Sequence, residues 1–260
     1  MTFALAGGGR VSASFIARLP QLRSQLGPVA AQSYRLASRI VNSIGAGTAV
    51  RGYADLKDSR LILICAPVRA VDAMVSALSE ALTCRGRIIL LCESDCDSRK
   101  LAHLRAQGAA VGSMQPIPGF EGRRFVVEGD RQAVREARSL ARALDSRAEE
   151  ATAEKMDLYL AALSFGASLF TPLLEAAVLS LRQAGMPQAS AVKVAEALFR
   201  ESLRGYVYAG KRSWSGPLAV GDRPAVEREL EALTASAPLL ARHYREASAW
   251  AQELLGGQKS

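Results

Sequence analysis

The chain has 260 residues, of which 49% are hydrophobic, and its 33 basic and 25 acidic side chains give a net charge of +8. This is the composition of a globular protein with room for one large domain or two ordinary ones. The basic excess permits anionic ligands. The arginines are scattered, however, and no basic block is interleaved with aromatic residues, so we expect no nucleic-acid partner.

The first residues and the cysteines indicate a reducing compartment. A signal peptide is not expected, because Gly7-Gly8-Gly9 interrupts the apolar residues early and no basic segment precedes them. Four cysteines in a chain of this length do not suggest a disulfide framework. We therefore expect a reduced, cytoplasmic protein.

The stretch from Thr2 to Ser12 predicts a short apolar strand, a glycine turn and the start of a helix. Gly7 would make the tight turn, and Gly9 would let the backbone approach a pyrophosphate at the helix N-terminus. Ser12 takes the place of the third small residue in the dinucleotide fingerprint. An ordinary glycine loop is the alternative. The predicted cofactor-binding residues of this stretch are Gly7, Gly8, Gly9, Arg10, Val11 and Ser12.

The next segment bears on the choice between NADP and NAD. A weak strand over residues 29–31 leads into a helix that ends at Ile44. An NAD-preferring domain places an acidic residue about 20 residues past the glycines, but none occurs between Gly9 and Arg51. A guanidinium pairs with a 2′-phosphate, which a carboxylate would repel. We therefore predict NADP, bound here by Ser33, Tyr34 and Arg35, with Arg39 one turn on. The alternative is that these arginines only decorate the helix surface.

Strand and helix patterns alternate through the next hundred residues. Residues 61–65 and 87–92 are continuous apolar runs rich in β-branched residues, which is typical of buried parallel strands. Further strands are predicted at 48–50, 109–114 and 124–128, and helices at 71–82, 101–107 and 132–144. This alternation predicts a doubly wound, mostly parallel α/β sheet. Ligands bind at the carboxyl ends of such strands, so we add Ala66, Pro67 and Val68 to the predicted cofactor site.

The pattern changes after Asp145, beyond which no convincing strand occurs. Helices are predicted at 151–184, 189–208, 223–235 and 239–255. We therefore divide the chain into an α/β domain, residues 1–148, and an all-α domain, residues 149–260. The apolar stretch 158–181 has about the length of a membrane span, but Pro172 and Glu175 interrupt it. We interpret it as a helix buried on most sides, in a domain core or a homodimer interface, and expect no membrane association.

Cysteine and histidine residues offer one candidate metal site. Cys92, Cys96 and His103 are of the right types. Their spacing fits no closed zinc site, and a fourth ligand is missing. We expect no metal.

Five segments together resemble a largely uncharacterised bacterial family, with a Rossmann-like N-terminal domain and a C-terminal domain like that of 6-phosphogluconate dehydrogenase. The segments are Ala6–Val11, Gly108–Pro116, Phe125–Asp130, Glu154-Lys155 with Tyr159, and Ser215-Gly216-Pro217 with Gly221-Asp222. The chain resembles pyrroline-5-carboxylate reductase and ketopantoate reductase more distantly. The resemblance spans nearly the whole chain and implies a Rossmann-like domain followed by a helical domain.

The chain departs from that family at the polar groups of the cleft. The family's His-x-Ser-Gly stretch corresponds to Leu91–Ser94 and its His-Pro pair to Gln115-Pro116, while Leu160 and Ser168 replace a His and an Asn. A reductase needs a group that supplies a proton. The resemblance leaves Lys155 as the acid/base candidate, with Tyr159 on the same helical face. The predicted catalytic residues are Lys155, Gln115 and Tyr159, and a merely exposed Lys155 at a helix start is the alternative.

Three functions follow from these observations. The first is an NADP-dependent oxidoreductase for a small carbonyl, imine or hydroxy compound, with the substrate between the domains near Gln115 and Lys155. The second, which the missing histidines favour, is a nucleotide-binding sensor or scaffold that has lost catalysis. The third is a binding module that uses the fold without a dinucleotide.

Overall fold

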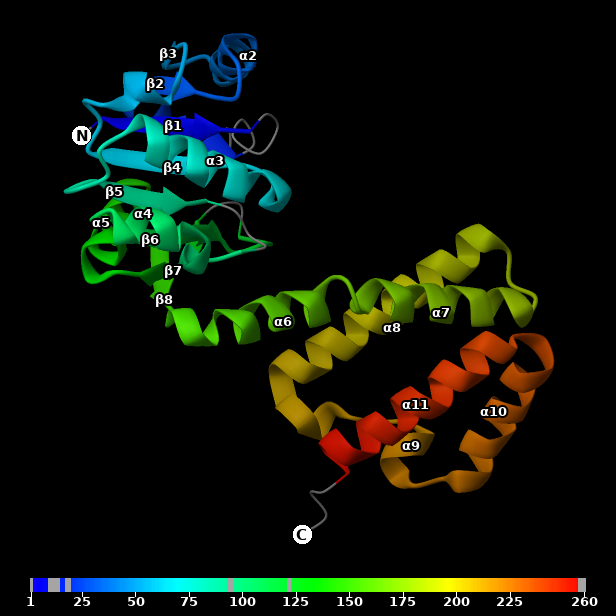
Figure 1. Cartoon of the computed structure of the whole chain (residues 1–260). Helices are drawn as coiled ribbons and strands as arrows, with labels where there is room; N and C mark the ends of the chain where they lie inside the picture. The colour runs from blue at the N-terminus through cyan, green and yellow to red at the C-terminus, as the bar shows by residue number, and fades with distance from the viewer. Residues whose placement is uncertain (1, 9–14, 17–19, 93–95, 121–122, 257–260) are drawn as a thin grey trace. The chain divides into compact units, whose positions relative to one another are not determined.

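The structure of the chain is a computed structural model that describes residues 2–8, 15–16, 20–92, 96–120 and 123–256. Two compact units make up the chain, Met1–Ala161 and Ala162–Ser260 (Figure 1). The first is an α/β unit and the second is helical, so the predicted fold class is confirmed. The domain boundary expected between residues 148 and 149 falls within a strand, and the division of the chain into two functional domains stays a prediction.

The α/β unit is built on one sheet in the order β3-β2-β1-β4-β5-β6-β7-β8. Its strands are β1 (Phe3–Gly7), β2 (Leu26–Ala30), β3 (Thr48–Ala49), β4 (Leu61–Cys65), β5 (Ile88–Leu91), β6 (Ala110–Pro116), β7 (Arg124–Gly129) and β8 (Arg147–Glu150). Neighbouring strands are parallel except for the β6–β7 pair. The sheet is therefore mostly parallel, as the alternating pattern predicted.

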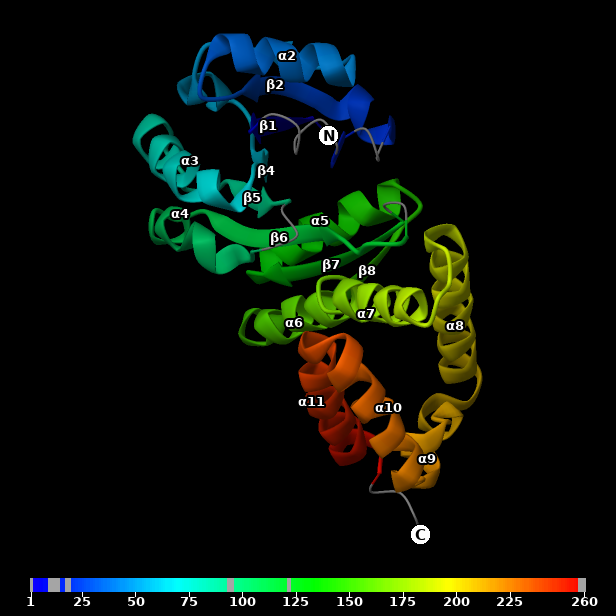
Figure 2. The ribbon, with the colours of Figure 1, turned by 90° about the vertical axis from the view of Figure 1, so that its right-hand side faces the viewer.

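Both faces of the central strands are buried, which explains their unbroken apolar sequences. In β4, Leu61 and Leu63 belong to one hydrophobic cluster and Ile62 and Ile64 to the other. The first cluster receives α2 (Tyr34–Ile44) and α5 (Arg131–Ala143), and the second receives α3 (Val68–Ala81) and α4 (Ala102–Ala106). Helices thus cover both faces of the sheet (Figure 2), as in a doubly wound fold.

Strand β8 corrects the expectation that no strand follows Asp145. Its sequence, Arg-Ala-Glu-Glu, carries three charged side chains and pairs with β7 alone. Charged residues are common on edge strands because they discourage pairing with another chain. Because of these charged residues, β8 lacks the alternation of apolar and polar residues by which a strand is recognised in a sequence.

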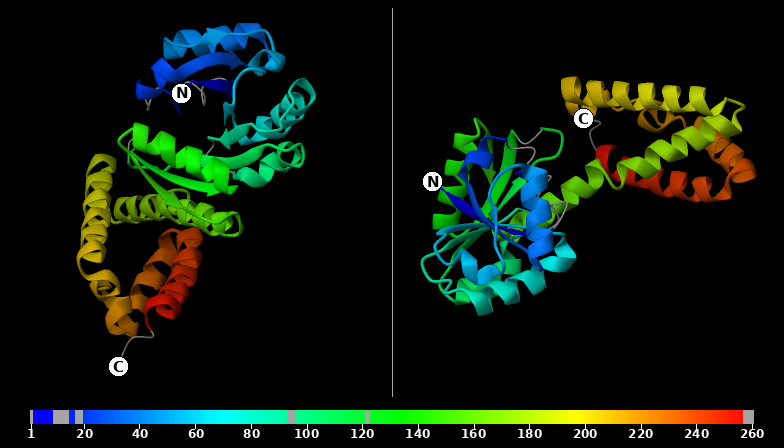
Figure 3. Two further views of the ribbon diagram at one scale, coloured as in Figure 1. Left: turned by 90° about the vertical axis from the view of Figure 1, so that its left-hand side faces the viewer. Right: turned by 90° about the horizontal axis from the view of Figure 1, so that it is seen from above.

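The helical unit contains two pairs of packed helices, α7–α8 and α10–α11 (Figure 3). The long helices are α6 (Met156–Gly166), which begins in the α/β unit, α7 (Phe170–Gln183), α8 (Gln188–Ala209), α10 (Arg223–Ser236) and α11 (Pro238–Leu255), with α9 (Pro217–Val220) short. The single helix predicted at 151–184 is wrong, because α6 and α7 are separate helices.

The apolar stretch 158–181 is not buried within the chain, which corrects the expectation of a core helix. Of its most apolar window, 6% is buried. The core cluster of this unit contains Val178, Ala191 and Ala195 as its buried members. Small alanine side chains let α7 and α8 approach closely but bury little area, so the larger apolar residues remain exposed.

Candidate functional site

The glycine turn lies at the carboxyl end of β1, between the neighbouring strands β2 and β4. The backbone N–H of Gly8 donates to the carbonyl oxygen of Cys65, the last residue of β4, at 2.9 Å. A Cβ atom at Gly8 would lie 3.0 Å from both the Ala66 Cβ and the Pro67 Cδ. The predicted approach of Ala66-Pro67 to the glycine turn is therefore present, and a side chain at position 8 would force its neighbours to shift by a few tenths of an ångström.

This position is the switch point of the sheet. The connection after β1 leads to β2 on one side, and β4 lies on the other side. Open α/β sheets bind their ligands in the crevice that such a reversal creates at the carboxyl ends of the strands. Gly7 ends β1 at this crevice, and Gly8 follows it. Gly9, Arg10, Val11 and Ser12 lie outside the described residues.

A second group of predicted residues follows β2. Ser33 caps helix α2, with its Oγ accepting a hydrogen bond from the Leu36 N–H at 3.2 Å. Tyr34 and Arg35 are exposed in the first turn, which contains no acidic residue. Within the part of the chain that the structure describes, Arg35 and Arg39 form no ion pair. The structure therefore presents free guanidinium groups at the end of β2.

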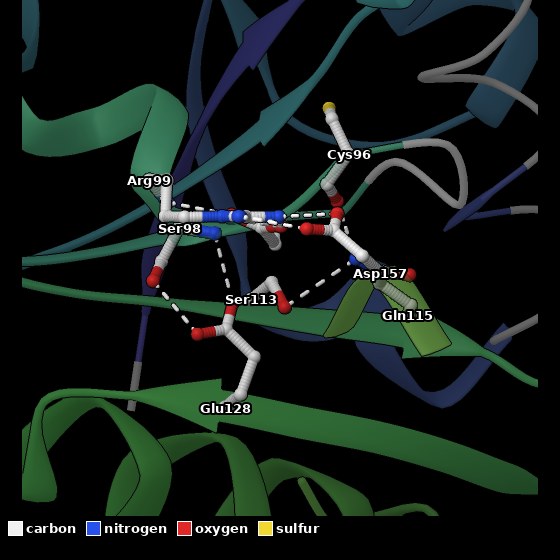
Figure 4. Close-up of polar contacts among 8 residues, drawn as sticks. Cys96, Ser98, Arg99, Ser113, Gln115, Glu128 and Asp157 are labelled. Carbon is white, nitrogen blue, oxygen red and sulfur yellow. Dashed lines mark hydrogen bonds and ion pairs between the residues drawn. The ribbon is translucent and has the colours of Figure 1, made fainter. Parts of the chain in front are cut away.

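Gln115 belongs to a buried polar cluster that Figure 4 shows beneath the segment after β5. Its amide nitrogen donates to the Cys96 carbonyl oxygen and, at 3.4 Å, to the Ser113 Oγ. Both Ser113 and Gln115 are fully buried on one face of β6. The Oε1 of Gln115 is also buried and finds no hydrogen-bond partner among the described residues. A buried acceptor without a partner is uncommon and makes Gln115 a candidate functional residue.

Glu128 on β7 fixes the same segment from the other side. It pairs with Ser113 across the β6–β7 ladder and is fully buried. Its two carboxylate oxygens accept hydrogen bonds from the Ser98 N–H at 2.8 Å and from the Ser98 Oγ at 2.7 Å (Figure 4). These bonds satisfy the buried oxygens of Glu128 and hold the start of the 3-10 helix η3 (Ser98–Leu101) over the sheet.

Arg99 connects this segment to helix α6. Its guanidinium bonds Asp97 at 2.6 Å and Asp157, in the first turn of α6, at 3.0 Å from Nη1 to Oδ2. The hydrogen bond from Arg99 lowers the pKa of the Asp157 carboxyl below its usual value. Asp97 and Asp157 raise the pKa of the Arg99 guanidinium in turn. The fork geometry gives the contact directionality.

Lys155 and Tyr159 lie near the start of α6 in different environments. Lys155 ends the 3-10 helix η4 (Ala153–Lys155), is exposed and has no ion pair among the described residues. The Tyr159 hydroxyl is buried and has no hydrogen-bond partner in the described part of the chain. Burial raises the pKa of the Tyr159 phenol above its ordinary value, so it stays protonated at neutral pH.

Several members of this cluster were missed by the sequence reasoning, namely Ser98, Arg99, Ser113 and Glu128. The available signal was the interruption of two apolar strands by buried polar residues, at 113, 115 and 128. Within the described residues, no group of three His, Cys, Asp or Glu side chains could hold a metal ion.

The fold and the crevice define the chain as a Rossmann-like domain followed by a helical domain. Residues 124–250, slightly less than half of the chain, match the family described as Domain of unknown function (DUF2520). No curated protein matches the chain by sequence.

Solved structures with the same two-part fold cover almost the whole chain. A protein from Thermotoga maritima is 15% identical, with a TM-score of 0.73 over 99% of this chain and 100% of that one. An imine reductase from Myxococcus stipitatus in complex with NADP⁺ is 14% identical, with a TM-score of 0.67 over 98% and 95%. A pyrroline-5-carboxylate reductase from Coxiella burnetii is 14% identical, with a TM-score of 0.60 over 97% and 98%. At these identities the similarity shows the fold.

Proposed function

We propose that the chain is an NADP-dependent oxidoreductase that acts on a small carbonyl, imine or hydroxy compound. The observation that carries the proposal is the side-chain-free position at Gly8, packed on Ala66 and Pro67 at the switch point between β1 and β4. That geometry leaves backbone at the place where a pyrophosphate binds in this fold. The imine and pyrroline-5-carboxylate reductases with the same fold support it.

The described residues fit a nicotinamide dinucleotide. Gly7 and Gly8, together with Gly9–Ser12 beyond the described residues, would receive the pyrophosphate, and Ala66–Val68 would line the crevice from β4. When bound, the nicotinamide supplies or accepts a hydride. The chain itself has to bind the substrate, orient it and move a proton.

Tyr159 is our candidate for the donor of that proton. Its phenol is shielded from water, stays protonated at neutral pH and has no hydrogen-bond partner among the described residues. Lys155, the stronger candidate from the sequence, is exposed to solvent and is the alternative donor. Gln115 would accept a hydrogen bond through its unpartnered Oε1 and so orient a substrate N–H or O–H group.

One observation favours the second candidate function, a nucleotide-binding sensor or scaffold without catalysis. Gln115 stands where the resembling family has a His-Pro pair, and its amide nitrogen already donates to Cys96 and Ser113. An amide has no titratable proton and cannot act as a general acid. A reductase of this kind would take its proton from a titratable group, for which Tyr159 and Lys155 are our candidates.

Titration of the purified chain with NADPH and NADH, followed by a panel of carbonyl, imine and hydroxy compounds, tests the proposal. Binding of NADPH with turnover of at least one compound class supports the reductase. Binding without turnover across the panel supports the sensor. If neither dinucleotide binds, both proposals are wrong and the fold serves another ligand.

Arg35→Ala is expected to weaken NADPH binding by about tenfold to a hundredfold, because a charge-assisted contact to the 2′-phosphate is lost. NADH lacks that phosphate, so its affinity should change by no more than about twofold. The dissociation constants can be read from the quenching or enhancement of cofactor fluorescence. Arg23→Ala is the matched control, because Arg23 is an exposed arginine in η1 (Pro20–Gln25), before β2 begins. Equal losses for both dinucleotides would contradict the assignment.

We propose a homodimer through the helical unit. Apolar side chains of α7 and α8 line a groove of about 560 Å³, and Leu203 on its wall is 63% exposed. Exposed apolar surface of this kind is typical of a surface that a partner covers. A second copy of the chain is the partner that the apolar stretch 158–181 suggests.

The dimer predicts a mass of twice the 27.7 kDa chain in light scattering at micromolar concentration. Leu203→Lys should shift the chain toward the monomer, because a buried charge opposes association. Leu239→Lys is the matched control, since Leu239 on α11 is 61% exposed and lies outside the groove. A monomeric wild-type chain would refute the proposal.

We also propose a cytoplasmic location without membrane association. Cys65, Cys84, Cys92 and Cys96 are buried and none of them is in a disulfide, an arrangement compatible with a reducing compartment. The run Ala153–Gln183 has the length and composition of a membrane span. A single such run is weak evidence for a membrane. Here the run is also divided between two helices, α6 and α7.

A further inference from the structure

Two arginines face each other at the start of the last two strands of the sheet. Arg124 of β7 and Arg147 of β8 are register partners in a parallel pair, so their side chains leave the same face of the sheet. Like charges in directly opposed positions destabilise a sheet. Within the described residues neither guanidinium has an ion pair. Arg124 lies over the Phe120 ring, with its Cζ 4.8 Å from the centroid.

Both arginines line one pocket of about 480 Å³. Its other described walls are Gly119, Phe120, Arg123 and Asp145, so among the described residues the lining contains more guanidinium groups than carboxylates. Glu149 lies two residues after Arg147 in β8 and therefore on the same face of the sheet. It is exposed and does not line the pocket. Residues 121 and 122 lie outside the described residues.

The pocket is close to the candidate active site along the strands. Because β6 and β7 are antiparallel, β7 begins at the edge where β6 ends, the carboxyl edge that binds ligands in this fold. Gln115 pairs with Val126, and Arg124 precedes Val126 by two residues. Arg124 and Gln115 therefore share a face of the sheet, displaced by about 7 Å along the strand direction.

The pocket is distinct from the predicted 2′-phosphate site. That site follows β2, which is five strands away from β7 in the order of the sheet. At the usual spacing of about 4.8 Å, the two positions are about 24 Å apart. An anion bound in the pocket would therefore be separate from a 2′-phosphate bound at Arg35.

We propose that Arg124 and Arg147 bind a carboxylate or phosphate group of the substrate, so that the proposed reductase acts on an anionic compound. An oxyanion between two guanidinium groups would replace their repulsion with charge-assisted hydrogen bonds. The assignment to the substrate rests on the proposed function. The binding of an oxyanion does not.

The first experiment measures anion binding without any turnover. The thermal-unfolding midpoint of the full chain is followed against sodium phosphate and, separately, sodium malonate, with sodium chloride holding the ionic strength constant. Phosphate and malonate distinguish a phosphate site from a carboxylate site. We expect at least one of them to raise the midpoint of the wild type, because a ligand that binds only the folded chain stabilises it.

The test variant is Arg124→Gln with Arg147→Gln, and the control is Arg135→Gln with Arg142→Gln. The control removes the same charge from exposed positions of α5, which packs on the opposite face of the sheet. The test variant should lose at least about tenfold in anion affinity, and the control should respond like the wild type. Without added anion, the test variant should unfold at or above the wild-type temperature, since a like-charge contact is removed. A merely structural role would lower it.

Two results would overturn the oxyanion site: no response of the wild type to either anion, or equal responses of both double variants.

The substrate assignment is tested by turnover of a cyclic imine that carries a carboxylate and of the same ring without it. We expect the test variant to raise KM only for the carboxylated ring, by at least about tenfold. Equal effects on both rings would refute the substrate assignment. If the wild type binds no NADPH and turns over nothing, the reductase proposal fails, and the titrations still decide the anion site.

Discussion

Replacing Gly8 by valine is expected to abolish detectable NADPH binding, a loss of at least about 1000-fold in affinity. The added Cβ would meet Ala66 and Pro67 at 3.0 Å and the Ala66 Cα at 3.1 Å, which is closer than ordinary van der Waals contact. The backbone of the turn or of the β4–α3 connection would have to move. Either movement displaces the amide groups that the pyrophosphate requires. Fluorescence titration with NADPH measures the loss.

Gly52→Val is the matched control for that experiment. Gly52 has extended backbone angles and open space around its Cβ position, so valine fits there without strain. The control should bind NADPH like the wild type, and circular dichroism should show both variants folded. Retained binding by a folded Gly8→Val variant would move the dinucleotide away from the β1 turn and remove the main support for the proposed function.

Tyr159→Phe is expected to lower kcat by about 100-fold to 1000-fold with a compound found in the substrate panel. The substitution removes only the hydroxyl that we propose as the proton donor, so the dissociation constant of NADPH should not change. The wild-type rate should also show a specific pH dependence. Because the pKa of Tyr159 is raised, its proton is held through neutral pH, and the contribution of the phenol is lost only as pH rises through that raised pKa. The variant should lack this alkaline limb.

Tyr53→Phe is the control for Tyr159→Phe. Its hydroxyl is likewise buried without a partner among the described residues, and burial likewise raises its pKa. It belongs to η2 (Tyr53–Leu56), before β4, so its removal should leave kcat unchanged. If Tyr159→Phe retains full activity while Lys155→Gln loses it, Lys155 is the donor. If both retain it, the proton comes from another group.

Much of the α/β unit could be predicted from local patterns. The strand Leu61–Cys65 has the predicted bounds, because each of its residues is apolar and both of its faces are buried. The end of α2 could also be predicted, because glycine commonly ends helices. Gly45 is its C-cap and has the positive φ of 73° that glycine adopts readily. The polar edge strand β8 could not be predicted, because only its pairing with β7 makes it a strand.

The candidate site was less accessible from the sequence than the fold. Gln115 and Tyr159 could be selected from the family resemblance, but not the unpartnered atoms that distinguish them from Lys155. Glu128 and Ser98 are thirty residues apart in the chain and meet only because β7 lies beside β6. A hydrogen bond between distant residues leaves no periodic signal in either segment.

The amino-acid sequence by itself determined the alternation of buried strands and helices, the glycine turn at the end of β1 and the change to an all-helical second half. These features follow from residue types within a few positions of one another, which set burial and backbone preference locally. Only the tertiary structure decided which side chains share a face and an edge of the sheet, among them Gln115 and the opposed pair Arg124–Arg147. Strand register decides this, because it sets which residues of distant segments lie opposite one another.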